Sequence, residues 1–111
     1  MLTQNMTPEF SKLEADLCYA FVDETRIRIL YALNECPRNV TELTRQLDSH
    51  QPKISRHLKV LRNLGLVVTR RQGVNVNYEL ADARLIDVLD ILRDVLRDHI
   101  TGKAVMIDKA I

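Results

Sequence analysis

The sequence predicts a mainly α-helical chain with one small β-hairpin, and three observations lead to that fold class. Apolar residues recur at helical spacing along most of the chain, and Gly and Pro, which interrupt helices, number only three each among 111 residues. Residues 66–80 instead alternate apolar and polar side chains around Gln72-Gly73, which is typical of two strands joined by a tight turn. A hydrophobic content of 46% with 28% charged residues indicates a folded protein rather than a disordered one.

The first helix is expected over about residues 8–22. Thr7 is a suitable cap, and Pro8 is tolerated in a first turn because its missing N–H would be unpaired there. Phe10, Leu13 and Leu17 begin an apolar stripe that Cys18 and neighbouring positions widen. The helix is therefore apolar over more of its circumference than a small monomer needs.

The second helix is expected to begin after Asp23, a good capping residue, and to end at Cys36-Pro37. It ends there because the residue before a proline is pushed out of the helical region. Arg26 and Arg28 are expected to be partly exposed on this helix. Together these signals define a short, half-buried helix.

A third helix is expected to start at Thr41, and a fourth at about Gln51 with Pro52 in its first turn. Either Ser49 or His50 caps the fourth helix, and the sequence does not decide between them. The two helices are separated by only a few residues. This short spacing indicates a tight turn between them.

The fourth helix, QPKISRHLKVLRNLGL from Gln51 to Leu66, has two different faces. Ile54, Leu58 and Leu61 recur at helical spacing on one of them. The other carries Lys53, Arg56, Lys59 and Asn63. A helix with one packing face and one basic face, between a helix-turn and a basic hairpin, suits the major groove of DNA. The alternative is an ordinary amphipathic helix with a solvated cationic face.

The hairpin that follows is expected to turn its apolar side inward, and the basic residues Arg70 and Arg71 lie near its tip together with Asn75. A last helix is expected from Asp82 to about Ile100, with Gly102 ending it. Its apolar residues repeat in a heptad-like stripe. Such a stripe needs a partner surface.

The net charge of +1 hides a strong asymmetry. Residues 38–76 carry eight basic and two acidic residues, a net charge of +6, while residues 1–37 carry −3 and residues 77–111 carry −2. Concentrated positive charge attracts polyanions such as DNA. The acidic flanks would then face away from the nucleic acid.

From about Asp23 to Leu80 the sequence resembles the ArsR/SmtB family of winged helix-turn-helix repressors, and the motifs QPKISRHL and LGLV resemble its arsenical-resistance branch. The resemblance implies a homodimeric, DNA-binding repressor that a metal ion, a metalloid, a thiol-reactive species or another small effector releases from a near-palindromic operator. It also implies one domain over residues 1–111, with DNA reading at about 38–80 and dimerisation through helices at about 8–22 and 82–100. The expected dimer residues are Phe10, Leu13, Leu17, Leu85, Leu89, Leu92 and Leu96.

The candidate DNA contacts follow from the chemistry of each side chain. Arg and Lys pair with guanine edges or phosphate, and Gln pairs with adenine. His57 lies close to Ile54 on the helical wheel, so a structural histidine and a DNA contact both remain open. The full set consists of Thr41 and Arg45 on the third helix, Gln51, Lys53, Ser55, Arg56, His57 and Lys59 on the fourth, and Arg70, Arg71 and Asn75 on the hairpin.

This sequence lacks the residues that bind the effector in the family that it resembles. Arsenical repressors carry Cys-Val-Cys at the start of the third helix, where this chain has Asn39-Val40-Thr41. The zinc pattern on the last helix, D-x-H-x10-H-x2-E or H, falls on Asp82, Arg84, Val95 and Asp98, of which only the carboxylates match. A zinc site without imidazole or thiolate is disfavoured.

Two cysteines, Cys18 and Cys36, remain as candidates for sensing arsenite, another soft metal ion or an oxidant. A helix of about 12 residues, rising about 18 Å, separates them. A disulfide needs Cα atoms within about 7 Å, so a site between subunits is favoured over one within a chain. The alternative is structural, with one buried small residue and one idle loop thiol. No cofactor is expected to be required for folding.

Other classes of function are disfavoured. The chain has no glycine-rich phosphate loop, metal-hydrolase spacing or nucleophile elbow, so we do not expect an enzyme. No apolar run approaches the roughly 20 residues that span a bilayer, and a cytoplasmic protein without membrane contact is expected. The rival is a winged-helix regulator or protein-interaction module without metal or thiol sensing. The +6 segment argues against a pure interaction module, which has no need of a cationic face.

Overall fold

The structure, a computed structural model, describes residues 7–110 of the chain, with side chains described as far as residue 102. It confirms the predicted fold class, mainly helical with one two-stranded antiparallel hairpin. The elements follow in the order α1 (Pro8–Cys18), the 3-10 helix η2 (Tyr19–Val22), α2 (Glu24–Glu35), α3 (Val40–Gln46), α4 (Gln51–Asn63), β1 (Val67–Gln72), β2 (Asn75–Leu80) and α5 (Arg84–Ala110).

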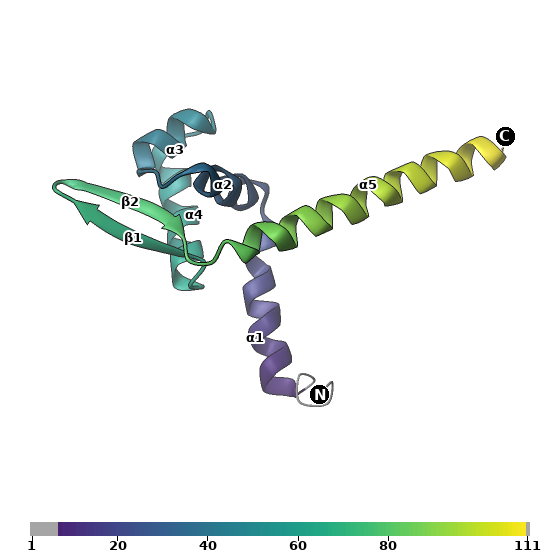
Figure 1. The fold of residues 1–111 in the computed structure, drawn as a ribbon, viewed down its shortest axis with the longest axis horizontal. Helices are drawn as coiled ribbons and strands as arrows, with labels where there is room; N and C mark the ends of the chain where they lie inside the picture. The colour runs from purple at the N-terminus through teal and green to yellow at the C-terminus, as the bar shows by residue number, and fades with distance from the viewer. Residues whose placement is uncertain (1–6, 111) are drawn as a thin grey trace.

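The chain forms a compact body from which two helical arms project (Figure 1). The body contains α2, α3, α4, the hairpin and the first turns of α5, and its core is built from aliphatic side chains such as Ile29, Leu43 and Ile54. The radius of gyration is 17.5 Å, whereas a compact domain of 100 residues has about 13 Å. The excess comes from α1 and the distal part of α5, which extend beyond the body.

The first helix is shorter than the sequence predicts. The Thr7 hydroxyl accepts a hydrogen bond from the Phe10 N–H, as expected of a cap, but α1 ends at Cys18 and the chain continues as η2. Just beyond this point, the guanidinium of Arg26 donates to the carbonyl oxygens of Tyr19 and Ala20. Those oxygens would otherwise accept from the next helical turn.

Arg26 is buried, with only 5% of its surface exposed, which corrects the expectation that it is partly exposed. Its Nε lies 3.1 Å from the Ala20 oxygen and its Nη2 lies 3.0 Å from the Tyr19 oxygen. Its guanidinium also stacks 5.0 Å from the centre of the Tyr19 ring. Arg28 is exposed, as expected, and it donates to the Leu47 carbonyl.

Asp23 caps α2 as predicted, accepting hydrogen bonds from the N–H groups of Thr25 and Arg26. The third helix, however, begins one residue earlier than the expected start at Thr41. Asn39 is its cap, and Glu42 returns a hydrogen bond to the Asn39 N–H, which forms a reciprocal capping box. This two-way bond satisfies two backbone donors at once, so it outweighs the single bond that a threonine cap offers.

The turn between α3 and α4 settles which residue occupies the cap of α4. His50 holds that position in an extended conformation, and its side chain makes no capping bond. Asp48 reverses the chain with a φ of 49°, a left-handed conformation that Asp tolerates better than most residues. The α4 N-terminus therefore lacks both a side-chain cap and an acidic first-turn residue.

The hairpin is fixed to the body at its base. Its strands pair from Val67 with Leu80 to Gln72 with Asn75, and Gly73 at the tip has a φ of 63°. Arg38 exchanges two backbone hydrogen bonds with Tyr78, which ties β2 to the connection between α2 and α3. The hairpin, which is the wing of this fold, is thus fixed by backbone hydrogen bonds to the segment that precedes the helix-turn-helix formed by α3 and α4.

The last helix begins near Asp82, whose carboxylate accepts from the Arg84 N–H, but Gly102 does not end it as expected. The helix continues to Ala110, because one glycine costs a helix only about 1 kcal/mol and no proline follows. The Tyr31 hydroxyl donates to Asp90 (2.8 Å) and fastens α5 to α2. No helix in the described part of the chain is long and apolar enough to cross a bilayer.

The buried role of Arg26 leads to a stability prediction. Arg26→Leu should lower the free energy of unfolding by about 2–4 kcal/mol, because it leaves two carbonyl oxygens without their donor. Urea denaturation at one fixed protein concentration measures this. Arg45→Leu, at an exposed position, is the matched control and should change stability by no more than about 0.5 kcal/mol. Equal stabilities of the two variants would contradict the anchoring role.

Candidate nucleic-acid interface and dimer surfaces

The fourth helix divides into a core face and a solvent face. Ile54, Leu58 and Leu61 are almost completely buried. The predicted DNA contacts Gln51, Ser55, Arg56 and Lys59 are exposed, and Lys53 is half-buried. Because the packing face holds the helix against the body, its polar and basic side chains are presented outward on a rigid element.

The predicted contacts on α3 are also exposed. Thr41 lies in the first turn and Arg45 in the last turn of α3, which packs against α4. One exposed cation of α4, Arg62, was not singled out from the sequence. Its position three residues after Lys59 is the signal that could have identified it.

The wing presents its basic residues unequally. Arg70 pairs with Glu79 on the neighbouring strand, so part of its charge is already compensated. Arg71 and Asn75 are exposed. Arg71 therefore brings more uncompensated charge to a phosphate backbone than Arg70 does.

His57 is buried on the inner side of α4, with 8% of its surface exposed. Its Nδ1 lies 3.3 Å from Nη1 of Arg26, and its Nε2 lies 3.6 Å from Oδ1 of Asp23. Of the two interpretations left open by the sequence, this placement favours the structural histidine over the DNA contact. The sequence signal for the buried partner was the position of Arg26, three and four residues before Ile29 and Leu30 of the core.

Charge and burial around His57 act on two pKa values. Burial, with the positive charges of Arg26, Arg56 and Lys53, lowers the pKa of His57, although the Asp23 carboxylate acts in the opposite sense. Burial alone would raise the pKa of Asp23, but its hydrogen bonds from the backbone of α2 and the charges of His57 and Arg26 outweigh this effect and lower it. The arrangement thus favours a neutral imidazole beside an ionised carboxylate.

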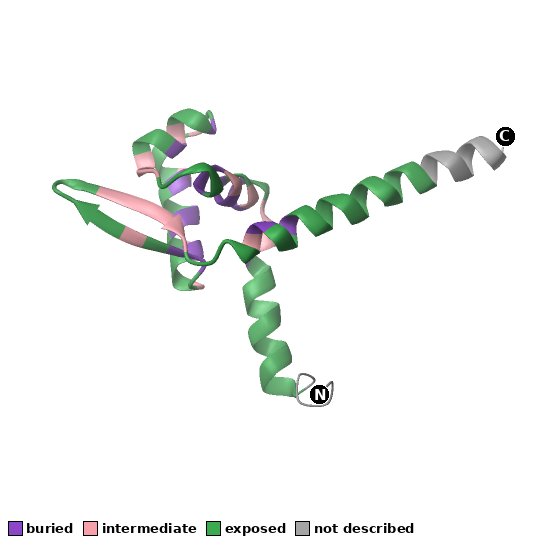
Figure 2. Ribbon diagram, viewed as in Figure 1, coloured by how far each residue is buried: buried purple, intermediate pink, exposed green. Residues whose placement is uncertain are grey.

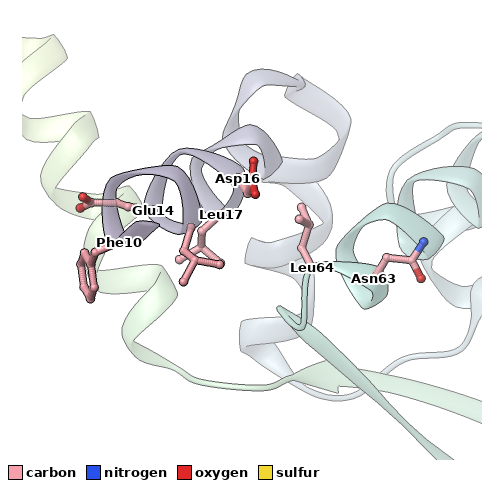
Figure 3. A pocket seen from close by; sticks show the side chains of 7 residues that line it. Phe10, Glu14, Asp16, Leu17, Asn63 and Leu64 are labelled. Carbon is pink, nitrogen blue, oxygen red and sulfur yellow. The ribbon is translucent and has the colours of Figure 1, made fainter. Parts of the chain in front are cut away.

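The first arm carries apolar side chains that contact no core. None of the residues of α1 is buried, and Phe10, Leu13 and Leu17, the predicted dimer residues, are exposed by 48%, 68% and 38%. They line a groove of about 620 Å³ between α1 and the end of α4. Figure 3 shows Leu17 and Leu64 on its two sides. An isolated chain would leave this groove in water.

The second arm, α5, has buried side chains where it leaves the body and exposed ones farther along (Figure 2). Leu89, one of the predicted dimer residues, is buried against the chain's own core, and Leu85 is half-buried. The prediction of Leu89 as an interface residue is therefore corrected, because its stripe turns under α2 at this end of the helix. The exposed apolar side chains in the described part of α5 are Val88, just before Leu89, and then Ile91, Leu92, Val95, Leu96 and Ile100.

The two cysteines are both free and exposed, so neither is the buried apolar residue of the structural alternative. They lie at opposite ends of the segment that contains η2 and α2. At the start of α3, where a thiolate pair would be needed, the Asn39 amide is engaged in the capping box. Among the described residues, no group of three or more His, Cys, Asp or Glu side chains is placed to hold a metal ion.

The zinc pattern considered on the last helix is likewise occupied by other interactions. Arg84 binds the Asp82 carboxylate through both Nε and Nη2, at distances of 2.7 to 3.2 Å. This contact lowers the pKa of Asp82 to about 2. An arginine thus takes the place at which the pattern requires a neutral imidazole.

Comparison with known proteins gives a consistent result. Residues 23–69 match the arsR family of bacterial regulatory proteins. The arsenical resistance operon repressor of Escherichia coli (strain K12) is 37% identical over 81% of this chain and 91% of its own length. The crystal structure of Rv0081 from M. tuberculosis has a TM-score of 0.78 and 31% identity, covering 88% of this chain and 98% of that one.

A second solved structure is also similar in fold. The homodimeric winged helix-turn-helix DNA-binding domain of Mb0332 from Mycobacterium bovis has a TM-score of 0.74 and 26% identity, covering 82% of this chain and 87% of that one. The family match over residues 23–69, together with 37% identity to a relative over 81% of this chain, shows that the chain belongs to the ArsR family of bacterial regulatory proteins.

Proposed function

We propose that this protein is a homodimeric transcriptional repressor that binds a near-palindromic operator through two α4 helices. The observation that carries the proposal is α4 itself. One side is fully embedded in the core, while Gln51, Ser55, Arg56 and Lys59 are presented outward in a segment of net charge +6. This is the arrangement by which a recognition helix enters the major groove.

The two arms support a dimer. In the described chain the exposed apolar residues of α1 and distal α5 far outnumber those of the body, and such surfaces are costly to leave in water. Burying them between two copies would link the two bodies. Half-sites one helical turn apart, about 34 Å, then match two linked recognition helices.

We propose that the effector is a soft, thiol-reactive species such as arsenite, and that it acts at Cys18, with Cys36 as a second candidate. The exposure of both thiols supports this, as does the name of the arsenical resistance operon repressor among the relatives. Cys18 lies at the junction of the α1 arm and η2. A modification there would act where the dimer helix meets the DNA-binding body.

The first prediction separates base reading from phosphate contact. Arg56→Ala should cost about 1–3 kcal/mol in operator binding and relax specificity, whereas Lys59→Ala should weaken all sequences about equally. Fluorescence anisotropy on the operator and on a scrambled duplex distinguishes the two effects. Wild-type affinity in both variants would remove the recognition helix from the interface.

The second prediction concerns assembly. Leu92→Asp should convert the dimer to monomers, because it places a carboxylate in the middle of the exposed stripe of α5, where burial without a partner is very costly. Arg97→Asp, on the opposite side of the same helix, is the matched control and should remain dimeric. Sedimentation equilibrium measures both. A dimer of Leu92→Asp with unchanged affinity would refute this interface.

The third prediction tests thiol sensing. The double variant Cys18→Ser, Cys36→Ser should bind operator DNA as the wild type does but should no longer be released by arsenite. An effector acts only through its different affinities for the bound and released states, and the variant removes the group that provides that difference. Release of the double variant at the same arsenite dose as the wild type would exclude the thiols as sensors.

A further inference from the structure

One buried cluster connects η2, α2 and α4. Arg26 lies on α2, donates to two carbonyl oxygens of η2 at the end of the α1 arm, and contacts His57 on α4. Its neighbour Asp23 begins α2 and faces the other ring nitrogen of His57. The cluster therefore joins the base of a dimer arm to the inner side of the recognition helix.

The contact with Arg26 determines which nitrogen of the His57 ring carries the proton. An arginine side chain only donates hydrogen bonds, so Nδ1 of His57, 3.3 Å from Nη1 of Arg26, must offer a lone pair. The ring proton then resides on Nε2, which points to the Asp23 carboxylate at 3.6 Å. A doubly protonated ring would bring an N–H against the guanidinium and would place two positive charges in contact.

We propose that Arg26 and His57 are positioning residues for DNA recognition: their contact sets α4 against the end of the α1 arm, and only neutral His57 supports it. Protonation of His57 opens the contact and releases α4 from its alignment with the arm. This inference rests on the proposed DNA-binding function. It adds a link that α5 does not provide, since the cluster connects η2, at the end of the α1 arm, to α4 through Arg26 of α2.

The charged groups around His57 oppose one another. Burial is the largest effect that lowers the pKa of His57, and Arg26 on α2 with Arg56 and Lys53 on α4 act in the same sense, whereas Asp23 favours the protonated ring. A folded-state pKa below the ordinary value means that neutral His57 stabilises the fold above about pH 6.5. This stability is lost as the pH falls through the folded-state pKa.

The direction in which acidification changes DNA affinity distinguishes a positioning role of His57 from a simple gain of positive charge. Adding positive charge to a DNA-binding protein by acidification strengthens its attraction to phosphate. Loss of alignment has the opposite effect on a specific operator, because two heads must match two half-sites. A fall in specific affinity on acidification, with unchanged or stronger binding to scrambled DNA, is therefore the signature of positioning.

The first measurement needs no DNA. Nitrogen-15 chemical shifts of the His57 ring in the full-length protein report which nitrogen carries the proton and where the ring titrates. We expect the Nε2–H tautomer at neutral pH and titration below the ordinary histidine value of about 6.5. A ring protonated on Nδ1, or one that titrates at or above the ordinary value, would overturn the proposal whether or not the protein binds DNA.

The second measurement compares operator affinity between about pH 8 and about pH 5 in wild type and two variants. The wild type should lose about five-fold or more in affinity on acidification. His57→Asn, whose amide oxygen can replace the Nδ1 acceptor without titrating, should lose this pH dependence. His57→Leu, which has no acceptor, should bind weakly throughout. Far-ultraviolet circular dichroism verifies that each protein is folded at each pH.

The controls separate this inference from the proposed function. His50→Asn, at the exposed cap of α4, should retain the pH dependence of the wild type. If the wild type binds no operator at either pH, DNA binding itself is wrong. If it binds and all three histidine variants show the same pH profile as the wild type, DNA binding stands and the positioning role of His57 is refuted.

Discussion

The buried guanidinium of Arg26 is the polar contact that holds η2, α2 and α4 together. It donates to the carbonyl groups of η2, just after the first helix ends, and it meets His57 from the other side. A buried cation is tolerated only where its donors are matched, and here carbonyl oxygens, an imidazole and the Tyr19 ring satisfy them. A single side chain thus links η2, α2 and the inner side of α4.

The fold could be predicted from the sequence because local signals and hydrophobic pattern agree. The Asp23 cap, the Cys36-Pro37 stop and the turn at residues 72–75 each have a local physical cause, and each is confirmed. The predicted start of α3 and the predicted end of α5 were wrong for a shared reason, because each depended on which of two local effects is stronger. At α3, the capping box is stronger than a start at Thr41. In α5, one glycine is too weak to end the helix.

The candidate site was predictable in part. The outward face of α4 follows from its period, and its predicted contacts are exposed apart from the half-buried Lys53 and the buried His57. What the sequence could not provide was tertiary pairing. Nothing local indicates that Arg70 meets Glu79, that Arg26 meets His57 across 31 positions, or that Leu89 turns under α2 rather than toward a partner. The first contact depends on how side chains lean across the hairpin, and the other two depend on the angles at which helices cross, which a periodic pattern does not contain.

The last helix runs without a break from the core of the body into the exposed distal arm, and this continuity has a mechanical consequence. The proximal turns, with Leu89 in the core and Asp90 held by Tyr31, move with the body, while the exposed stripe from Leu92 onward is free to pack against another chain. The continuous helix therefore fixes the rotational position of its distal stripe relative to the body. Adding one residue between Leu89 and Leu92 would rotate the distal stripe by about 100° about the helix axis. Two recognition helices could then be turned out of phase with the DNA without any change in either body.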